Sequence, residues 1–135
     1  AAKLASTPQE LESFLQPLSS AGIDIFHCSQ RRFWEPEFEG SGLNLAGWTK
    51  KLTGKPSITV GSVTLNQEFT TSFRNPDTAM VTGIEELLDR MDRGEFDLVA
   101  VGRSLIVNPD WPGIVQRGAV EELQPFQRDV LQQLV

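Results

Sequence analysis

A short apolar run that ends at a glycine and leads into a helix constrains this chain more than any other feature. The run 98–101 (LVAV) is followed directly by Gly102 and Arg103, and a short helical stretch ending at 108–109 comes next. A strand that passes through a glycine into a helix start presents backbone N–H groups and the positive end of a helix dipole. Such a turn can bind a phosphate group, and the Arg103 guanidinium can donate two hydrogen bonds to the same oxygens.

A second apolar run ends in the same way. Residues 57–60 (SITV) are followed by Gly61 and Ser62, which add backbone N–H groups and a hydroxyl. Two consecutive strands with glycines at their carboxyl ends match the phosphate site after strands 7 and 8 of a (β/α)8 barrel. We therefore expect Gly61 and Ser62 to lie beside Gly102 and Arg103 in one anion site.

Strands and helices are predicted to alternate along the chain. The sequence predicts helices over 8–22, 45–52 and 84–93 and strands over 23–29, 57–60 and 98–101, with a loop over 30–44, a turn at 75–77 and a last helix near the C-terminus. Thr7 and Glu10 form a capping box for the first helix, and Pro17 is expected to kink it or end it early. Alternation of this kind is typical of a parallel α/β fold with near-continuously buried strands.

Apolar residues at helical spacing define the faces expected to point inward. They are Leu11, Phe14, Leu15 and Leu18; Leu45, Trp48 and Leu52; Ile84, Leu87, Leu88 and Met91; and Phe126, Val130, Leu131 and Leu134.

Length limits how much of a barrel the chain can form. A (β/α)8 barrel needs about 250 residues, whereas the chain has 135. We therefore predict that residues 1–135 are the last three βα units, strands 6–8, of a single barrel domain, and that the chain is a fragment of it.

Composition narrows the partners and the compartment. The chain is 39% hydrophobic and 22% charged, with a net charge of −6. An acidic chain does not favour a nucleic-acid partner, and no apolar run approaches the roughly 18 residues that span a bilayer. Because Cys28 is the sole cysteine, no internal disulfide can form, and a reducing cytoplasm is the predicted compartment.

Three stretches carry a resemblance to a known family. In chain order they are GIDIFHCSQRRFWEP, KPSITVGSVTL and GEFDLVAVGRSLIVNPDW. From about Leu11 to its end the chain resembles the C-terminal part of the old yellow enzyme family, FMN-dependent NAD(P)H oxidoreductases of which many are ene-reductases. The resemblance implies FMN as cofactor, NADH or NADPH as hydride donor and an electron-poor alkene as substrate. It also implies that Gly102 and Arg103 bind the FMN phosphate.

The same resemblance implies that the chain holds no catalytic residue. The family's proton donor is a tyrosine, and the chain contains no tyrosine. We therefore expect this segment to supply the phosphate anchor and part of one pocket wall, and to show no turnover on its own.

Several other residues have two possible roles. His27 and Cys28 end a predicted strand, where neighbours point to opposite faces, so one is expected in the core and the other at the flavin pocket. A zinc site has no support, because the chain has one histidine and one cysteine. Trp34 either walls a substrate channel or packs at the surface, and Trp111 either reaches over the cofactor or packs against the last helix.

The remaining predictions concern the acidic loop, the alternatives to a flavin enzyme and self-association. Glu35, Glu37 and Glu39 are expected to be a solvated acidic loop rather than a catalytic carboxylate pair. The same phosphate site could serve an aldolase or isomerase barrel, and the chain could instead be a non-catalytic interaction module. Open sheet edges also predict that the chain on its own associates with copies of itself.

Overall fold

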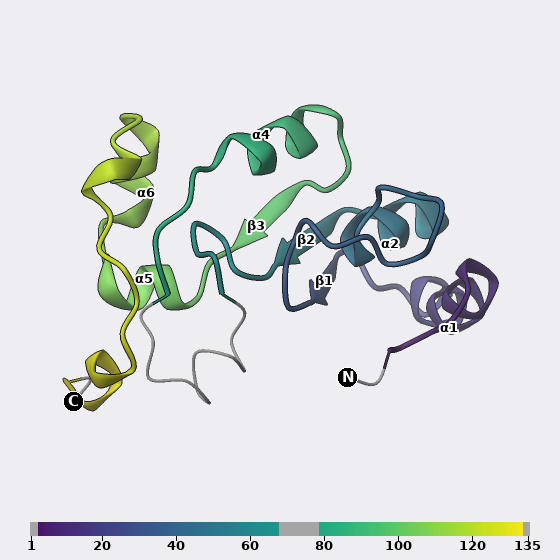
Figure 1. Ribbon diagram of the computed structural model, residues 1–135. Helices are drawn as coiled ribbons and strands as arrows, with labels where there is room; N and C mark the ends of the chain where they lie inside the picture. Colours follow the sequence, from purple (N-terminus) through teal and green to yellow (C-terminus); the bar gives the residue numbers. More distant parts are fainter. Residues whose placement is uncertain (1–2, 68–78, 134–135) are drawn as a thin grey trace.

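Three short parallel strands form one sheet in this computed structural model, which describes residues 3–67 and 79–133. The strands are β1 (Phe26–Ser29), β2 (Ser57–Val60) and β3 (Leu98–Ala100), in the spatial order β1-β2-β3. Both pairs are parallel, and helices lie between the strands along the chain (Figure 1). The prediction of a parallel α/β arrangement is confirmed.

Helices pack against the sheet and against one another, and two of them lie beyond the carboxyl end of β3 (Figure 1). They are α1 (Pro8–Ser20), α2 (Leu45–Thr53), α4 (Glu85–Asp92), α5 (Arg103–Val107) and α6 (Trp111–Gln116), with 3-10 helices η1 (Val120–Glu122) and η2 (Arg128–Gln133). Helix α2 packs on β1 and β2, and α1 packs on α2. Helices α5 and α6 lie beyond the arrowhead of β3 (Figure 1). None of the helices within the described ranges is long and apolar enough to cross a membrane.

Side-chain caps explain where the first two helices begin. The Thr7 hydroxyl accepts a hydrogen bond from Glu10 N (3.2 Å), as predicted, but the Glu10 carboxylate accepts from Ser6 N (2.7 Å) and not from Thr7. In α2 the Asn44 side chain accepts from Gly47 N (2.9 Å) and also donates to the Phe33 carbonyl (2.8 Å). Asn44 therefore fastens the loop after β1 to the start of α2.

The expected early end of the first helix is wrong. Helix α1 continues past Pro17 to Ser20. Pro17 lies in the last turn, where its missing N–H removes a single bond, and its carbonyl still accepts from Ala21 N (3.0 Å). The helix is then followed by Gly22, at φ +100°.

The core is continuous across α1, α2, α4 and the sheet, but several expected inward residues are exposed. Phe14 and Leu88 are each 47% exposed and Leu98 is 51% exposed. Leu88 lies about 100° around the helix from Leu87. Leu87 therefore belongs to the buried face of α4, and Leu88 lies at the edge of that face. β1 starts at Phe26 and alternates between buried and exposed residues. Continuous burial of the strands is thus a wrong prediction, because successive side chains point to opposite faces of the sheet and in β1 only one of these faces is buried.

The C-terminal segment contains less helix than expected. Residues 128–133 form the 3-10 helix η2, preceded by Phe126, which is 1% exposed and packs in a small cluster with Leu65 and Ala79. The predicted turn at 75–77 and the predicted core residue Leu134 lie outside the described residues.

Two ion-pair networks join elements that are distant in sequence. The Arg90 guanidinium on α4 donates to the Gly42 and Trp34 carbonyls (3.0 and 3.2 Å) and pairs with Glu86 and Glu95 (2.9 and 3.2 Å). It therefore holds the loop after β1 against α4.

The second network lies at the amino ends of β2 and β3. The Asp97 carboxylate accepts from Ser57 N (2.9 Å) and Lys50 Nζ (2.8 Å), which joins β3 to β2 and α2.

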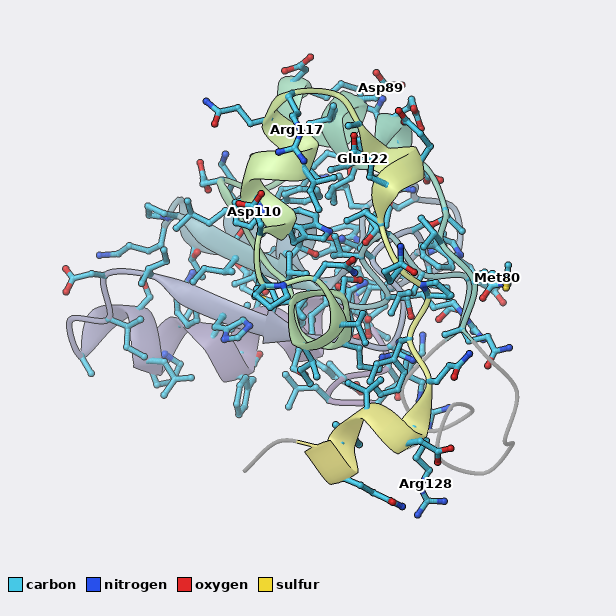
Figure 2. All side chains as sticks on the ribbon, turned by 90° about the vertical axis from the view of Figure 1, so that its left-hand side faces the viewer. Met80, Asp89, Asp110, Arg117, Glu122 and Arg128 are labelled. Atoms are coloured by element: carbon cyan, nitrogen blue, oxygen red, sulfur yellow. The ribbon has the colours of Figure 1, made fainter. Side chains whose placement is uncertain are left out.

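Near the C-terminus, Arg117 lies between Asp110 and Glu122 and fastens α6 to η1 (Figure 2).

Candidate functional site

A cavity of about 480 Å³ opens at the carboxyl end of the sheet. The last residues of the three strands, Ser29, Val60 and Ala100, all line it. The cavity is also lined by all four predicted site residues, which are Gly61, Ser62, Gly102 and Arg103. The structure therefore places the two glycine turns side by side, at the end of a parallel sheet where α/β proteins commonly bind ligands.

The turn after β2 has a backbone that depends on its glycine. Gly61 has φ +138°, and a Cβ at this position would lie 2.6 Å from the Gln30 carbonyl oxygen. The Gly61 carbonyl accepts from Phe33 N (3.1 Å). Only glycine permits this close approach of the loop after β1 to the loop after β2.

Ser62 and Arg103 make hydrogen bonds to the loops that surround the cavity. The Ser62 hydroxyl lies 3.0 Å from the Arg31 carbonyl and 2.8 Å from the Gln67 carbonyl. Arg103 Nη2 donates to Ser62 Oγ (3.3 Å) and to the Gln67 carbonyl. The Arg103 side chain is buried and also lies over the Phe126 ring, 5.7 Å from its centroid. These bonds fix Arg103 at the cavity wall.

The start of α5 adds backbone donors to the same wall. The first bond of α5 runs from Leu105 N to the Gly102 carbonyl (2.9 Å). The N–H groups of Arg103 and Ser104 precede this bond, and the first N–H groups of a helix have no partner within the helix. Gly102 itself is exposed, with φ −105° and ψ −95°.

The charge of the cavity wall is opposite to that of the chain. Arg31 and Arg103 are its charged residues, and no aspartate or glutamate is among the described residues that line it. The whole chain has a net charge of −6. Two guanidinium groups and backbone donors, with no carboxylate in the described lining, favour an anionic ligand.

The chain is similar to a known NADH oxidase. It is 31% identical over 127 residues to the "NADH oxidase" of Thermoanaerobacter brockii, an alignment that covers 88% of the chain and 17% of that protein. The chain thus spans about a sixth of the length of this relative. No known protein-family profile matches the chain.

His27 and Cys28 lie on opposite sides of β1. Cys28 is 6% exposed and belongs to the core, whereas His27 is exposed. Burial raises the pKa of the Cys28 thiol, and a hydrogen bond with Thr49 opposes this rise. The prediction that one of the pair is a core residue is therefore confirmed for Cys28. His27 lines a second cavity of about 510 Å³, between α1 and the loop after β1, and not the cavity that holds Arg103.

Trp34 and Trp111 both make contacts within the protein. Trp34 packs edge-on against Phe33, with 5.1 Å between the ring centroids. Trp111 Nε1 donates to Thr64 Oγ1 (3.1 Å), so its indole contacts the loop after β2, and its side chain packs against the main core. In the acidic loop Glu35 and Glu39 are exposed, but Glu37 is half-buried, and burial raises the pKa of its carboxyl while Lys3 opposes the rise.

Sequence reasoning missed the residues that hold the site's loops in place. Thr64 and Ser104 are buried beside the cavity and bond to each other (2.9 Å). Asn108 bridges the carbonyls of Ser104 (3.0 Å) and Gln124 (3.1 Å). In the sequence, Asn108 is recognisable only as the end of the short helical stretch before Pro109. Within residues 3–67 and 79–133 no group of three or more His, Cys, Asp or Glu side chains could hold a metal ion.

Proposed function

We propose that the cavity beside Arg103 binds the phosphate of FMN, and that the intact protein is an FMN-dependent NAD(P)H oxidoreductase of the old yellow enzyme type. One observation carries the proposal. Two glycine turns meet at the carboxyl end of the sheet, with Arg31 and Arg103 and without a carboxylate in the described lining. The similarity to a protein named NADH oxidase supports a nicotinamide substrate.

The arrangement of the sheet supports a place in a larger barrel. The strands are parallel and joined through helices, and the cavity lies at their carboxyl ends. Barrel enzymes often bind phosphate with the loops after their last two strands. We propose that β1, β2 and β3 are strands 6–8 of a (β/α)8 barrel, and that residues 1–135 form the C-terminal part of one domain.

Each residue of the site has a separate task in this proposal. Arg103 binds the phosphate oxygens from a wall that Ser62 and Gln67 hold in place. Gly61 lets the loop after β1 approach the loop after β2 closely, and the backbone donors of the loop after β2 reach the anion from there. When bound, FMN supplies hydride transfer between NADH or NADPH and an electron-poor acceptor such as an activated alkene. The chain has no tyrosine, so a tyrosine proton donor would come from another part of the protein.

Flavin content of the intact protein tests the proposal. Purified protein is predicted to carry noncovalent FMN, seen as flavin absorbance and identified by mass after release, and NADH or NADPH is predicted to bleach it. Reoxidation by an enone would support the alkene substrate. A protein that takes up no FMN but binds a sugar phosphate would instead favour an aldolase or isomerase barrel and contradict the proposal.

A further inference from the structure

The loop after β2 contains a residue in an unusual conformation. Thr64 has φ +56° and is 1% exposed. A β-branched residue at positive φ is a backbone outlier and persists only where the surrounding structure determines it. Ser62, two residues earlier, also has a positive φ, of +51°. Something must therefore hold residues 61–65 in this shape.

A chain of hydrogen bonds from the segment after β3 supplies that support. Trp111 Nε1 donates to Thr64 Oγ1 (3.1 Å), and Thr64 Oγ1 lies within hydrogen-bond distance of Ser104 Oγ (2.9 Å). Ser104 Oγ in turn donates to the Val63 carbonyl (2.8 Å). The Thr64 hydroxyl also lies 2.7 Å from the Val63 carbonyl. Its single proton can be donated to Ser104 Oγ or to this carbonyl, and in either case the bonds connect the indole to the backbone of the loop.

The chain of bonds joins the two halves of the proposed anion site. Val63 and Ser104 line the cavity together with Ser62 and Arg103. Ser62 belongs to the turn after β2, and Ser104 and Trp111 belong to α5 and α6 after β3. The Thr64 hydroxyl is thus the point where the two turns are fastened to each other, although Thr64 does not itself line the cavity.

We propose that Thr64 is a positioning residue for the phosphate of the bound ligand, acting through the Trp111–Thr64–Ser104 bonds. This inference rests on the proposed function of the cavity. The bonds hold the backbone donors of the loop after β2 at a fixed distance from Arg103. Loss of the Thr64 hydroxyl leaves the indole N–H unpaired and lets the loop leave its left-handed conformation.

Variants of the intact protein separate positioning from simple folding. Thr64→Val keeps the shape of the side chain and removes the hydroxyl, and Thr64→Ser restores a hydroxyl. Trp111→Phe removes the donor at the other end of the chain of bonds. Trp48→Phe is its matched control, because the buried Trp48 Nε1 has no hydrogen-bond partner among the described residues.

Binding of FMN and riboflavin is the first readout, since riboflavin lacks the phosphate. Thr64→Val is expected to raise the FMN Kd about tenfold, the effect of losing one buried hydrogen bond, and to leave the riboflavin Kd unchanged. Thr64→Ser should recover most of the FMN affinity. Trp111→Phe should weaken FMN binding and Trp48→Phe should not. Equal FMN affinity in wild type and Thr64→Val, or equal losses from the two Trp→Phe changes, would overturn the proposal.

Amide hydrogen exchange at residues 61–65 gives a second readout that needs no ligand. Thr64→Val and Trp111→Phe are expected to speed exchange at these amides, while α2 keeps its protection. Unchanged exchange would overturn the positioning role. If wild-type protein binds no FMN, the proposed function fails, and the exchange data still decide whether the Thr64 hydroxyl holds the loop.

Discussion

Arg90 illustrates how much of the site's framework depends on single buried side chains. It is 10% exposed in its side chain and pairs with Glu95, which is 11% exposed. Arg90→Met removes the more buried of the two arginines that pair with Glu95 and releases two loop carbonyls, and we expect it to lower the free energy of unfolding by about 3 kcal/mol. Urea denaturation measures this loss.

Arg93→Met is the matched control for that change. Arg93 also pairs with Glu95 (2.8 Å), but its side chain is 58% exposed, so its loss should cost less than about 1 kcal/mol. Equal destabilisation by the two variants would show that burial of Arg90 is not the cause.

Cys28 has the chemistry of a nucleophile but the surroundings of a core residue. It is buried against α2, and burial raises the pKa of its thiol, which keeps the thiolate scarce at neutral pH. We expect Cys28→Ser to leave the proposed enone reduction by the intact protein within about one order of magnitude, since a buried thiol of raised pKa is a poor nucleophile. Loss of turnover with FMN still bound would contradict this.

At the residue scale, the sequence predicts the members of the site better than their contacts. Gly61 directly follows the apolar run 57–60, and Arg103 follows Gly102 after the run 98–101. Because these runs form neighbouring parallel strands, the residues after them lie at the same end of the sheet. The bonds from Ser62 to the Arg31 and Gln67 carbonyls depend on loop conformations that no spacing rule gives. The positive φ of Thr64 runs against the preference of β-branched residues, so propensity points away from it.

At the scale of elements, Asp97 connects β3, β2 and α2. The hydrogen bond from Lys50 and, less strongly, that from Ser57 N lower the pKa of the Asp97 carboxyl below its ordinary value of 3.8. A lowered pKa in the folded state stabilises the protein above pH 3.8, and this contribution is lost as the pH falls from there through the folded-state pKa. Asp97→Asn is expected to lower stability at neutral pH and to flatten the acid limb of the stability curve.

Asp24→Asn is a suitable control for that experiment, because Asp24 is exposed in the segment before β1. Urea midpoints measured from neutral pH to below pH 3 should converge for wild type and Asp97→Asn as the carboxyl is protonated, roughly as linkage requires. A constant difference across the whole pH range would rule out the charge of Asp97 as the cause.

The sequence predicts helix ends well, because the hydrogen bonds that cap a helix join residues close together in the chain. Thr7, Asn44 and Gly54 mark helix ends through bonds to residues at most four positions away. Exposure depends on what covers an element, which explains the errors at Phe14 and Leu98. Both would be correct inward residues if further elements packed there.

At the scale of the whole molecule, the sheet has two open edges among the described residues. β1 and β3 each pair with β2 alone, and Ile25 and Leu98 near them are 39% and 51% exposed. Open edges and exposed apolar residues favour pairing with other chains. We therefore predict that the 135-residue chain on its own self-associates and that Leu98→Lys reduces the association. Light scattering over a concentration series measures it, and a stable monomer at all concentrations would contradict the prediction.

The central claim is that the cavity at the carboxyl end of the sheet binds the phosphate of a flavin. Its most direct test is the ratio of FMN to riboflavin affinity in the intact protein, measured by flavin fluorescence titration for wild type, Arg103→Ala and the exposed control Arg117→Ala. Wild type and Arg117→Ala should prefer FMN, and Arg103→Ala should lose about 1.5–3 kcal/mol of FMN binding with riboflavin binding unchanged. Equal affinity of wild type for FMN and riboflavin, or an unchanged FMN Kd in Arg103→Ala, would contradict the claim.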